Sequence, residues 1–233
     1  MIAAGALRFF GGYSLGFISG SFFEDRYPDK TSQFAIMNAV VVIGGGLPAS
    51  MLGGWISDRY EAKYGSVKGL IAGCGALAAV PFIIVTYAVQ PGFWPAILSY
   101  YVAYFVAEMW YGPAHAQINN MFPSEYQGFA VAVFNLTGAI AGTVATLSLG
   151  AFKSKFDSGL EADAEQDAKI NGYILTGGVL FSYLTCGPLF IMSGLKYSEQ
   201  LEKNKQELKQ KAYEATGGHK VAADTAGPDT GPY

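Results

Sequence analysis

Charged side chains are scarce in this sequence, and cysteine and histidine are scarcer still. Only 14% of the residues are charged, the formal net charge is -3, and the two cysteines and two histidines form no metal-ligating or redox spacing. The sequence also contains no phosphate-binding loop and no nucleophile elbow. We therefore expect no enzyme, no catalytic residue, no cofactor and no metal. The dispersed basic residues give no footprint for a nucleic acid.

Apolar residues dominate instead. They make up 51% of the chain, and the mean hydropathy is +0.25, which is unusual for a soluble domain. A helix needs about 20 mostly apolar residues to cross a bilayer. Six windows meet this requirement: 3–23, 34–56, 67–89, 93–114, 128–152 and 171–195. The sequence therefore predicts an all-α integral membrane protein with a six-span bundle over residues 1–195.

Two segments follow the last predicted span. Residues 196–215 are rich in helix-forming Lys, Glu and Gln, and are predicted to be a charged helical extension exposed to water. Residues 216–233 are rich in Gly, Pro, Ala and Asp. Such a composition cannot build a core, so we expect this tail to be ordered only where a partner binds it.

Lys and Arg are distributed unevenly between the two ends of the predicted spans. One end carries Arg59, Lys63, Lys68, Lys196, Lys203, Lys205, Lys209 and Lys211, and the other carries Arg26, Lys30, Lys153, Lys155 and Lys169. Since Lys and Arg accumulate on the cytoplasmic side of membrane proteins, both termini are predicted to lie there, or on the matrix side if the membrane is the mitochondrial inner membrane.

Small residues recur every four positions in three of the predicted spans. Close packing of membrane helices uses such stripes, because small side chains let two backbones approach. The stripes are Gly12, Gly16 and Gly20; Gly46, Ser50 and Gly54; and Gly138, Gly142, Thr146 and Gly150. We expect them to be helix-packing positions.

The connector after the second span has a distinctive sequence, GWISDRYEAK, at residues 54–63. It resembles the signature connector of the major facilitator superfamily, and AEMWYGPAHAQ at residues 107–117 is similar to spinster-like and organic-anion-type members. The resemblance implies a gating role for Gly54, Asp58, Arg59 and Lys63. One departure is Gln127, where the family usually has Arg before the glycine, and this puts the gating network in doubt.

Such transporters have two six-span halves, and the long charged tail matches the C-terminal half best. Twelve spans of about 20 residues need about 240 residues before any loops, whereas this chain has 233. The resemblance therefore implies half a transporter, completed by a second six-span half, by a second copy, or by incorporation into a larger membrane complex. Membrane lipids are the other expected partners.

Two ionisable residues, Arg8 and Glu108, fall inside predicted spans, where burial of charge is costly and marks candidates for function. Their positions near span ends on the same side predict a similar depth. The resemblance implies that their helices line a central cavity, with Arg8 binding an anionic substrate and Glu108 carrying a coupling proton. A snorkelling Arg8 or a structural ion pair are the alternatives.

Five polar or amphipathic residues are secondary pathway candidates, and for each the alternative is an ordinary interhelical hydrogen bond or packing contact. They are Tyr13, Asn38, Tyr111, His115 and Gln117.

The sequence thus favours half of a proton- or ion-coupled transporter for a small solute. Two alternatives remain open: a transport-inactive structural subunit of a respiratory or photosynthetic type of complex, and a truncated product without independent function.

Overall fold

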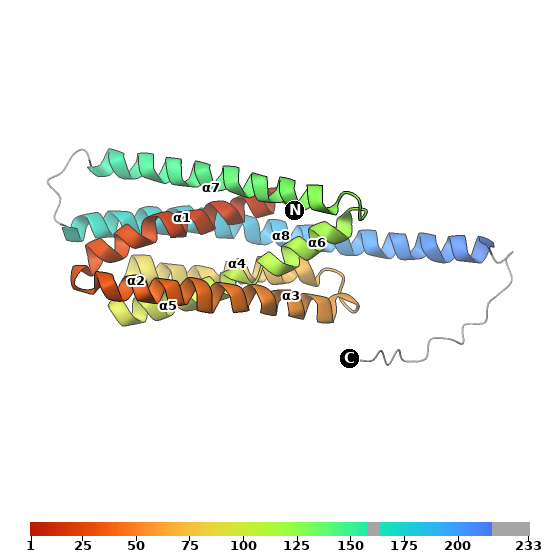
Figure 1. Ribbon diagram of the computed structural model, residues 1–233, viewed down its shortest axis with the longest axis horizontal. Coiled ribbons are helices and arrows are strands. Elements are labelled where there is room, and N and C mark those ends of the chain that lie inside the picture. The colour runs from red at the N-terminus through yellow and green to blue at the C-terminus, as the bar shows by residue number, and fades with distance from the viewer. Residues whose placement is uncertain (158–163, 216–233) are drawn as a thin grey trace.

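The structure is a computed structural model in which residues 1–157 and 164–215 are described. Every regular element in these ranges is helical, and none of them is a strand (Figure 1). In chain order the elements are α1 (Ile2–Arg26), η1 (Pro28–Lys30), α2 (Thr31–Val40), η2 (Val41–Gly46), α3 (Leu47–Glu61), α4 (Val67–Ile84), η3 (Val85–Val89), α5 (Phe93–Glu108), α6 (Tyr111–Met121), α7 (Gln127–Asp157) and α8 (Ala164–Ala215). The prediction of an all-α fold is confirmed.

Four helical stretches are long and apolar enough to cross a membrane: Pro28–Glu61, Val67–Val89, Gln127–Lys155 and Lys169–Glu214. By their length and composition, these stretches are compatible with a membrane protein. The first of them runs through η1, α2, η2 and α3 with no loop between these elements. Six crossings stay a prediction, because neither α1 nor the pair α5 and α6 is among these stretches.

The predicted span 93–114 is not one helix, so this detail of the prediction was wrong. The helix α5 ends at Glu108, two residues turn, and α6 starts at Tyr111 and runs to Met121. Pro113 lies in the first turn of α6, where the missing N–H of proline costs nothing. At this point the chain therefore ends one helix and starts another, and does not bend within a single helix.

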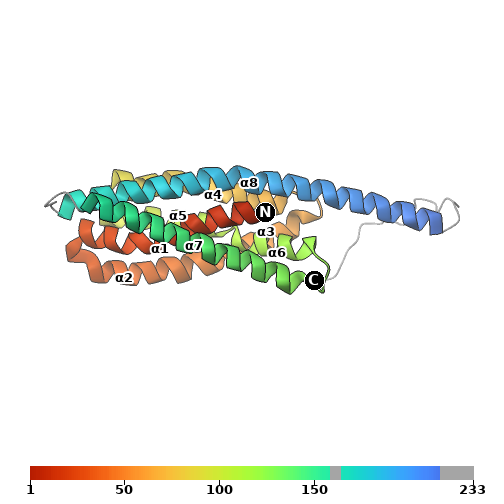
Figure 2. The ribbon, with the colours of Figure 1, turned by 90° about the horizontal axis from the view of Figure 1, so that it is seen from above.

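The helices lie side by side along the long axis of the molecule (Figures 1 and 2). The helix α1 packs on α8 and α7, α4 packs on α8 and α5, and α3 packs on α6. Between α4 and α8 the backbones approach closely, since a Cβ added to Gly69 would lie 2.6 Å from the Cα of Gly194. In Figure 2, α4 and α8 form one side of the bundle, and α1, α2 and α7 form the other.

The glycine stripes have different outcomes. Gly138 and Gly142 of α7 hold the rings of Phe9 and Tyr13, so these two positions do pack as predicted. In α1, however, a Cβ added to Gly16 or Gly20 would meet no atom of the described chain within 4 Å. Within the described chain these two positions therefore pack against no neighbour, and packing against a partner stays a prediction.

The contact of α1 with α8 uses another glycine. A Cβ added to Gly11 would lie 2.4 Å from the Ser182 hydroxyl oxygen and 2.7 Å from the Tyr183 ring. Gly12, the first member of the predicted stripe, faces the Arg8 guanidinium at 3.2 Å instead. A four-residue spacing identifies one face of a helix but does not say whether a neighbour covers that face.

Two helices extend beyond the windows predicted for them. The windows 128–152 and 171–195 lie within α7, which continues to Asp157, and α8, which begins at Ala164. At its other end α8 continues without a break through residues 196–215 and projects beyond the bundle (Figure 1). The tail 216–233 lies outside the described residues.

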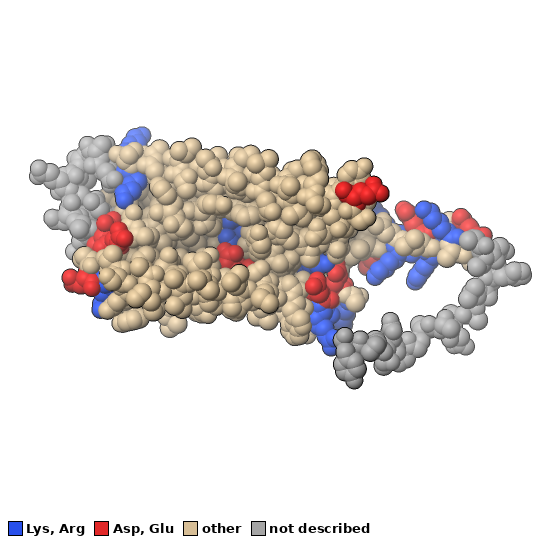
Figure 3. Space-filling view, viewed as in Figure 1, with Lys and Arg blue, Asp and Glu red and all other residues tan. Residues whose placement is uncertain are grey.

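Charged residues gather at the two ends of the helix bundle, and the surface between them is almost uncharged (Figure 3). A small spot of blue and red atoms interrupts this uncharged surface midway along the face shown. Such an arrangement suits a bilayer, whose hydrocarbon core disfavours charge while its two surfaces accept it.

Candidate functional site

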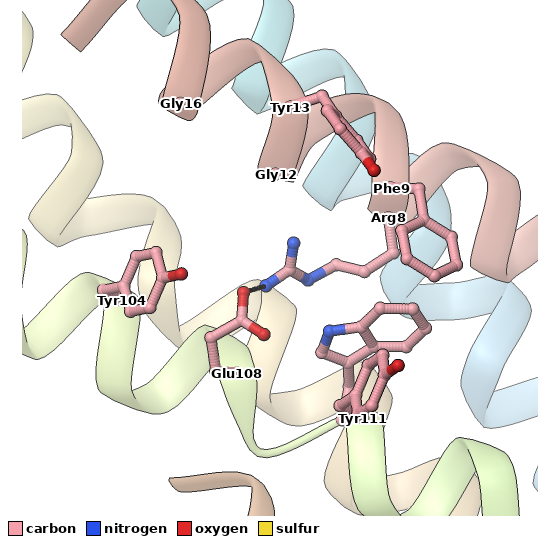
Figure 4. A pocket seen from close by; sticks show the side chains of 9 residues that line it. Arg8, Phe9, Gly12, Tyr13, Gly16, Tyr104, Glu108 and Tyr111 are labelled. Atoms are coloured by element: carbon pink, nitrogen blue, oxygen red, sulfur yellow. Dashed lines mark hydrogen bonds and ion pairs between the residues drawn. The ribbon is translucent and has the colours of Figure 1, made fainter. Parts of the chain in front are cut away.

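Arg8 and Glu108 form an ion pair inside the bundle. Arg8 lies in the second turn of α1, and Glu108 is the last residue of α5. One guanidinium nitrogen, Nη2, donates to Oε1 of Glu108 at 2.8 Å and to the carbonyl oxygen of Ala107 at 3.0 Å (Figure 4). The side chains are 2% and 21% exposed, respectively. The sequence placed these residues at a similar depth, and the structure brings them into contact.

The break after α5 helps to build this site. Carbonyl groups in the last turn of a helix lack an intrahelical partner, and Arg8 donates to one of them, that of Ala107. The end of α5 thus supplies both a charged and a neutral acceptor to the same guanidinium group. A continuous helix through residues 107–111 would use the Ala107 carbonyl oxygen in its own ladder.

Two aromatic rings enclose the guanidinium group. Its Cζ lies 5.3 Å from the centroid of the Trp110 ring and 4.7 Å from that of Tyr183. Both distances fit cation–π contacts, which gain strength where water is excluded. Three buried polar atoms of this group, Nε of Arg8, Nε1 of Trp110 and the hydroxyl of Tyr183, have no hydrogen-bond partner in the described part of the chain.

The pair lies at the wall of a cavity of about 230 Å³ between α1, α5 and α6 (Figure 4). The lining residues are Arg8, Phe9, Gly12, Tyr13, Gly16, Tyr104, Glu108, Trp110 and Tyr111. Among the predicted pathway residues, Arg8, Glu108, Tyr13 and Tyr111 line it. Gly12 and Gly16, predicted for packing, line it as well.

Phe9, Tyr104 and Trp110 were missed by the sequence analysis. Tyr104 stands four residues before Glu108, and therefore on the same face of α5. Phe9 shares a face with Gly12, Tyr13 and Gly16 for the same reason. Helical spacing from Glu108 was thus the signal that would have found Tyr104, and helical spacing from Tyr13 was the signal for Phe9, whereas Trp110 lies in the turn that the prediction did not contain.

His115 lies next to this cavity without lining it. Its Nδ1 is 3.0 Å from the carbonyl oxygen of Tyr111, and its Nε2 is 3.2 Å from Oδ1 of Asn135. The imidazole ring also lies 4.2 Å, centroid to centroid, from the Tyr111 ring. His115 thus contacts one residue of the cavity wall, Tyr111, through both its backbone and its ring.

Asn38 and Gln117 lie apart from the cavity. Asn38 accepts a hydrogen bond from the Tyr100 hydroxyl at 3.3 Å. Gln117, which is buried, donates through Nε2 to the Ser193 hydroxyl oxygen at 3.3 Å. Both therefore make the interhelical hydrogen bonds that were the alternative to a pathway role.

The connector after α3 carries an ion pair that includes none of the four residues with the implied gating role. Nζ of the buried Lys68 lies 2.6 Å from Oε2 of Glu61, whose Oε1 accepts a hydrogen bond from the Tyr197 hydroxyl at 3.2 Å. Asp58 is exposed and makes no hydrogen bond or ion pair with the described residues. The network thus joins α3, α4 and α8 through Glu61.

The remaining residues of the predicted connector each have different neighbours. Arg59 is exposed in the last turn of α3, and Nζ of Lys63 lies 5.1 Å from the ring centroid of Tyr64. Gly54 packs against Gly112, since a Cβ added to Gly112 would lie 3.2 Å from the Gly54 Cα. Gln127, in the place of the usual arginine, donates to the Phe122 carbonyl oxygen at 3.3 Å. A gating role for the connector stays a prediction.

No known protein family, curated protein or solved structure matches this chain. Its function therefore has to be argued from the geometry of its own residues.

Proposed function

We propose that this chain is half of a secondary-active transporter for a small solute, of the major facilitator type, and that it needs a second six-helix half or another partner to complete a pathway. The observation that supports this proposal is the Arg8–Glu108 pair at the wall of a cavity. Charges at bilayer depth are costly and are kept where a function uses them.

The pair can respond to a proton or to an anion. Glu108 keeps 21% of its side chain exposed while Arg8 is almost fully enclosed, so Glu108 is the member that a proton reaches from the cavity. Protonation removes the charge that Arg8 pairs with, and a carboxylate or another anion in the cavity then becomes the better partner for the guanidinium group. Proton binding and solute binding are coupled in this way at one site.

The test is transport by the chain purified together with its native partners and reconstituted into sealed vesicles. A pH gradient is imposed, and uptake is measured for a panel of labelled organic anions. Glu108→Gln should abolish proton-driven uptake while solute exchange without a gradient survives, whereas Arg8→Ala should abolish both. Cys74→Ser, at an exposed position away from the cavity, is the matched control. Unchanged uptake in both variants would remove the pathway assignment.

A second candidate function has its own support. The Arg8 guanidinium group is held by Glu108, the Ala107 carbonyl oxygen and two rings, which is also what a purely structural ion pair needs. The end of α8 projects beyond the bundle as a largely exposed rod (Figure 1). Both features suit a transport-inactive structural subunit of a large membrane complex. Copurification at fixed stoichiometry with such a complex, together with no uptake, would favour it.

A further inference from the structure

A second and larger cavity, of about 760 Å³, lies where α6 ends and α7 begins. The start of α1 forms its third wall. The lining residues are Met1, Ile2, Ala3, Ile118, Met121, Phe122, Tyr126, Phe129, Ala130, Val133 and Phe134. This end of the bundle is the one that carries the α3–α4 connector (Figure 1).

The lining is apolar and carries no charged side chain. The Tyr126 hydroxyl is the one strong side-chain hydrogen-bonding group among the lining residues, and Met1 adds a weakly accepting sulfur and its amino group. A buried water needs two to four polar partners, and most of this lining offers none. Its volume is within the range of about 300–1,000 Å³ that holds small ligands. A hydrocarbon chain, which the surrounding bilayer supplies, fits both the volume and the lining.

A cation stands beside this cavity. The Ser193 hydroxyl of α8 lies 3.5 Å from the sulfur of Met1, which lines the cavity. Lys196 follows three residues later and thus on the same face of α8, towards the end of the bundle where the connector lies. Lys196 is exposed and forms no ion pair within the described residues. An anionic headgroup with its chain in the cavity would meet this ammonium group at the membrane surface.

We propose that this cavity holds one acyl chain of an anionic phospholipid, whose phosphate binds Lys196. The lipid is a resident ligand that fills the space between α1, α6 and α7. This site is separate from the Arg8–Glu108 cavity, because the rings of Phe9, Trp110 and Phe134 lie between the two, with centroids 5.1 to 6.2 Å apart. The site does not depend on the chain being a transporter.

Trp110 provides a built-in probe. The sequence contains three tryptophans, and Trp55→Phe with Trp94→Phe leaves Trp110 alone. Trp110 is 2% exposed, so bulk lipid does not touch its ring, but Phe134 of the cavity does. The purified full chain is placed in nanodiscs in which either phosphatidylglycerol or phosphatidylcholine carries brominated acyl chains, which quench tryptophan fluorescence at short range.

We expect brominated phosphatidylglycerol to quench Trp110 at least twofold more than brominated phosphatidylcholine at the same mole fraction. Ala130→Phe fills the cavity and should abolish the quenching, while Ala132→Phe, on the exposed face of the same helix, should leave it unchanged. Lys196→Gln should make the two lipids equivalent. Native mass spectrometry of the same samples should show one retained phosphatidylglycerol, lost in Ala130→Phe.

Two outcomes would overturn the proposal. Quenching that Ala130→Phe does not reduce would mean that lipid reaches Trp110 by another route. Equal quenching by the two lipids in the parent protein, or no quenching at all, would mean that the cavity holds a neutral molecule or part of a protein chain instead of an anionic phospholipid.

Discussion

The sequence could single out Arg8 and Glu108 as candidate residues, but it could not predict the contacts that they make. Charges are so rare in the apolar windows that the sequence singles out both residues, and their places in the windows indicate a common depth. Their contacts were not predictable, because Trp110 lies in the turn before α6 and Tyr183 lies in α8, and both meet Arg8 only after α1, α5, α6 and α8 have packed. Which rings enclose a cation depends on helix rotation, and periodicity does not fix rotation.

Arg8→Ala is expected to lower the free energy of unfolding by about 3 kcal/mol, because it leaves the mostly buried Glu108 carboxylate without its cation. The double variant Arg8→Ala with Glu108→Ala should lose less than the sum of the two single variants, since no orphan charge remains. The measurement is equilibrium unfolding of the purified chain in mixed detergent micelles, followed by circular dichroism.

Arg59→Ala is the control for this series. Arg59 is exposed and makes no ion pair with the described residues, so its removal should change the free energy of unfolding by less than about 0.5 kcal/mol. Strictly additive losses in the double variant would mean that Arg8 and Glu108 do not stabilise each other, and would weaken the assignment of the pair as a coupled unit.

The individual helices were largely predictable, because the length of an apolar run is a local property of the sequence. The six predicted windows are helical in the structure apart from the turn at residues 109–110. Two kinds of detail were not predicted: where one helix ends and the next begins, and which helix faces contact another part of the chain. Gly112 and Pro113 lie at the start of a new helix, yet the predicted span 93–114 runs through both of them. The stripe of Gly12, Gly16 and Gly20 was interpreted as a contact, although nothing in the described chain covers Gly16 or Gly20.

This difference between glycines leads to a matched pair of variants. Gly142→Ala should lower the free energy of unfolding by about 1–3 kcal/mol, because the new Cβ would lie 2.5 Å from the Tyr13 ring and force α1 and α7 apart. Gly16→Ala meets no atom and should be neutral, or stabilising by up to about 1 kcal/mol through helix propensity. Unfolding of each variant in the same micelles measures both effects.

A destabilising Gly16→Ala would contradict the structural account of α1. It would mean that the Gly16 face packs against something in the purified protein, either a second copy or residues outside the described ranges. Gly142→Leu extends the comparison, since a larger side chain at this position should cost more than alanine if the Tyr13 ring is what it meets.

For the whole molecule, four helical stretches meet the length and hydropathy needed for a membrane span, while six are predicted. One of the two missing candidates, the predicted span 93–114, has a physical explanation. The helices α5 and α6 are separate and have 16 and 11 residues, each too short to cross a hydrocarbon core that takes about 20. After the turn, however, α6 continues obliquely to the end of the bundle where α7 begins (Figure 1), and membrane proteins tolerate such breaks where protein surrounds them.

Cysteine labelling tests whether α5 and α6 together form a crossing. In a chain with Cys74→Ala and Cys186→Ala, single cysteines replace Asp29, Ala62 or Ser124, all of which are exposed. Sealed vesicles are treated with a membrane-impermeant maleimide before and after permeabilisation. If α5 and α6 together form a span, positions 62 and 124 label from one side and position 29 from the other. If they do not cross, position 124 labels together with position 29, and the Arg8–Glu108 cavity then loses its place at bilayer depth.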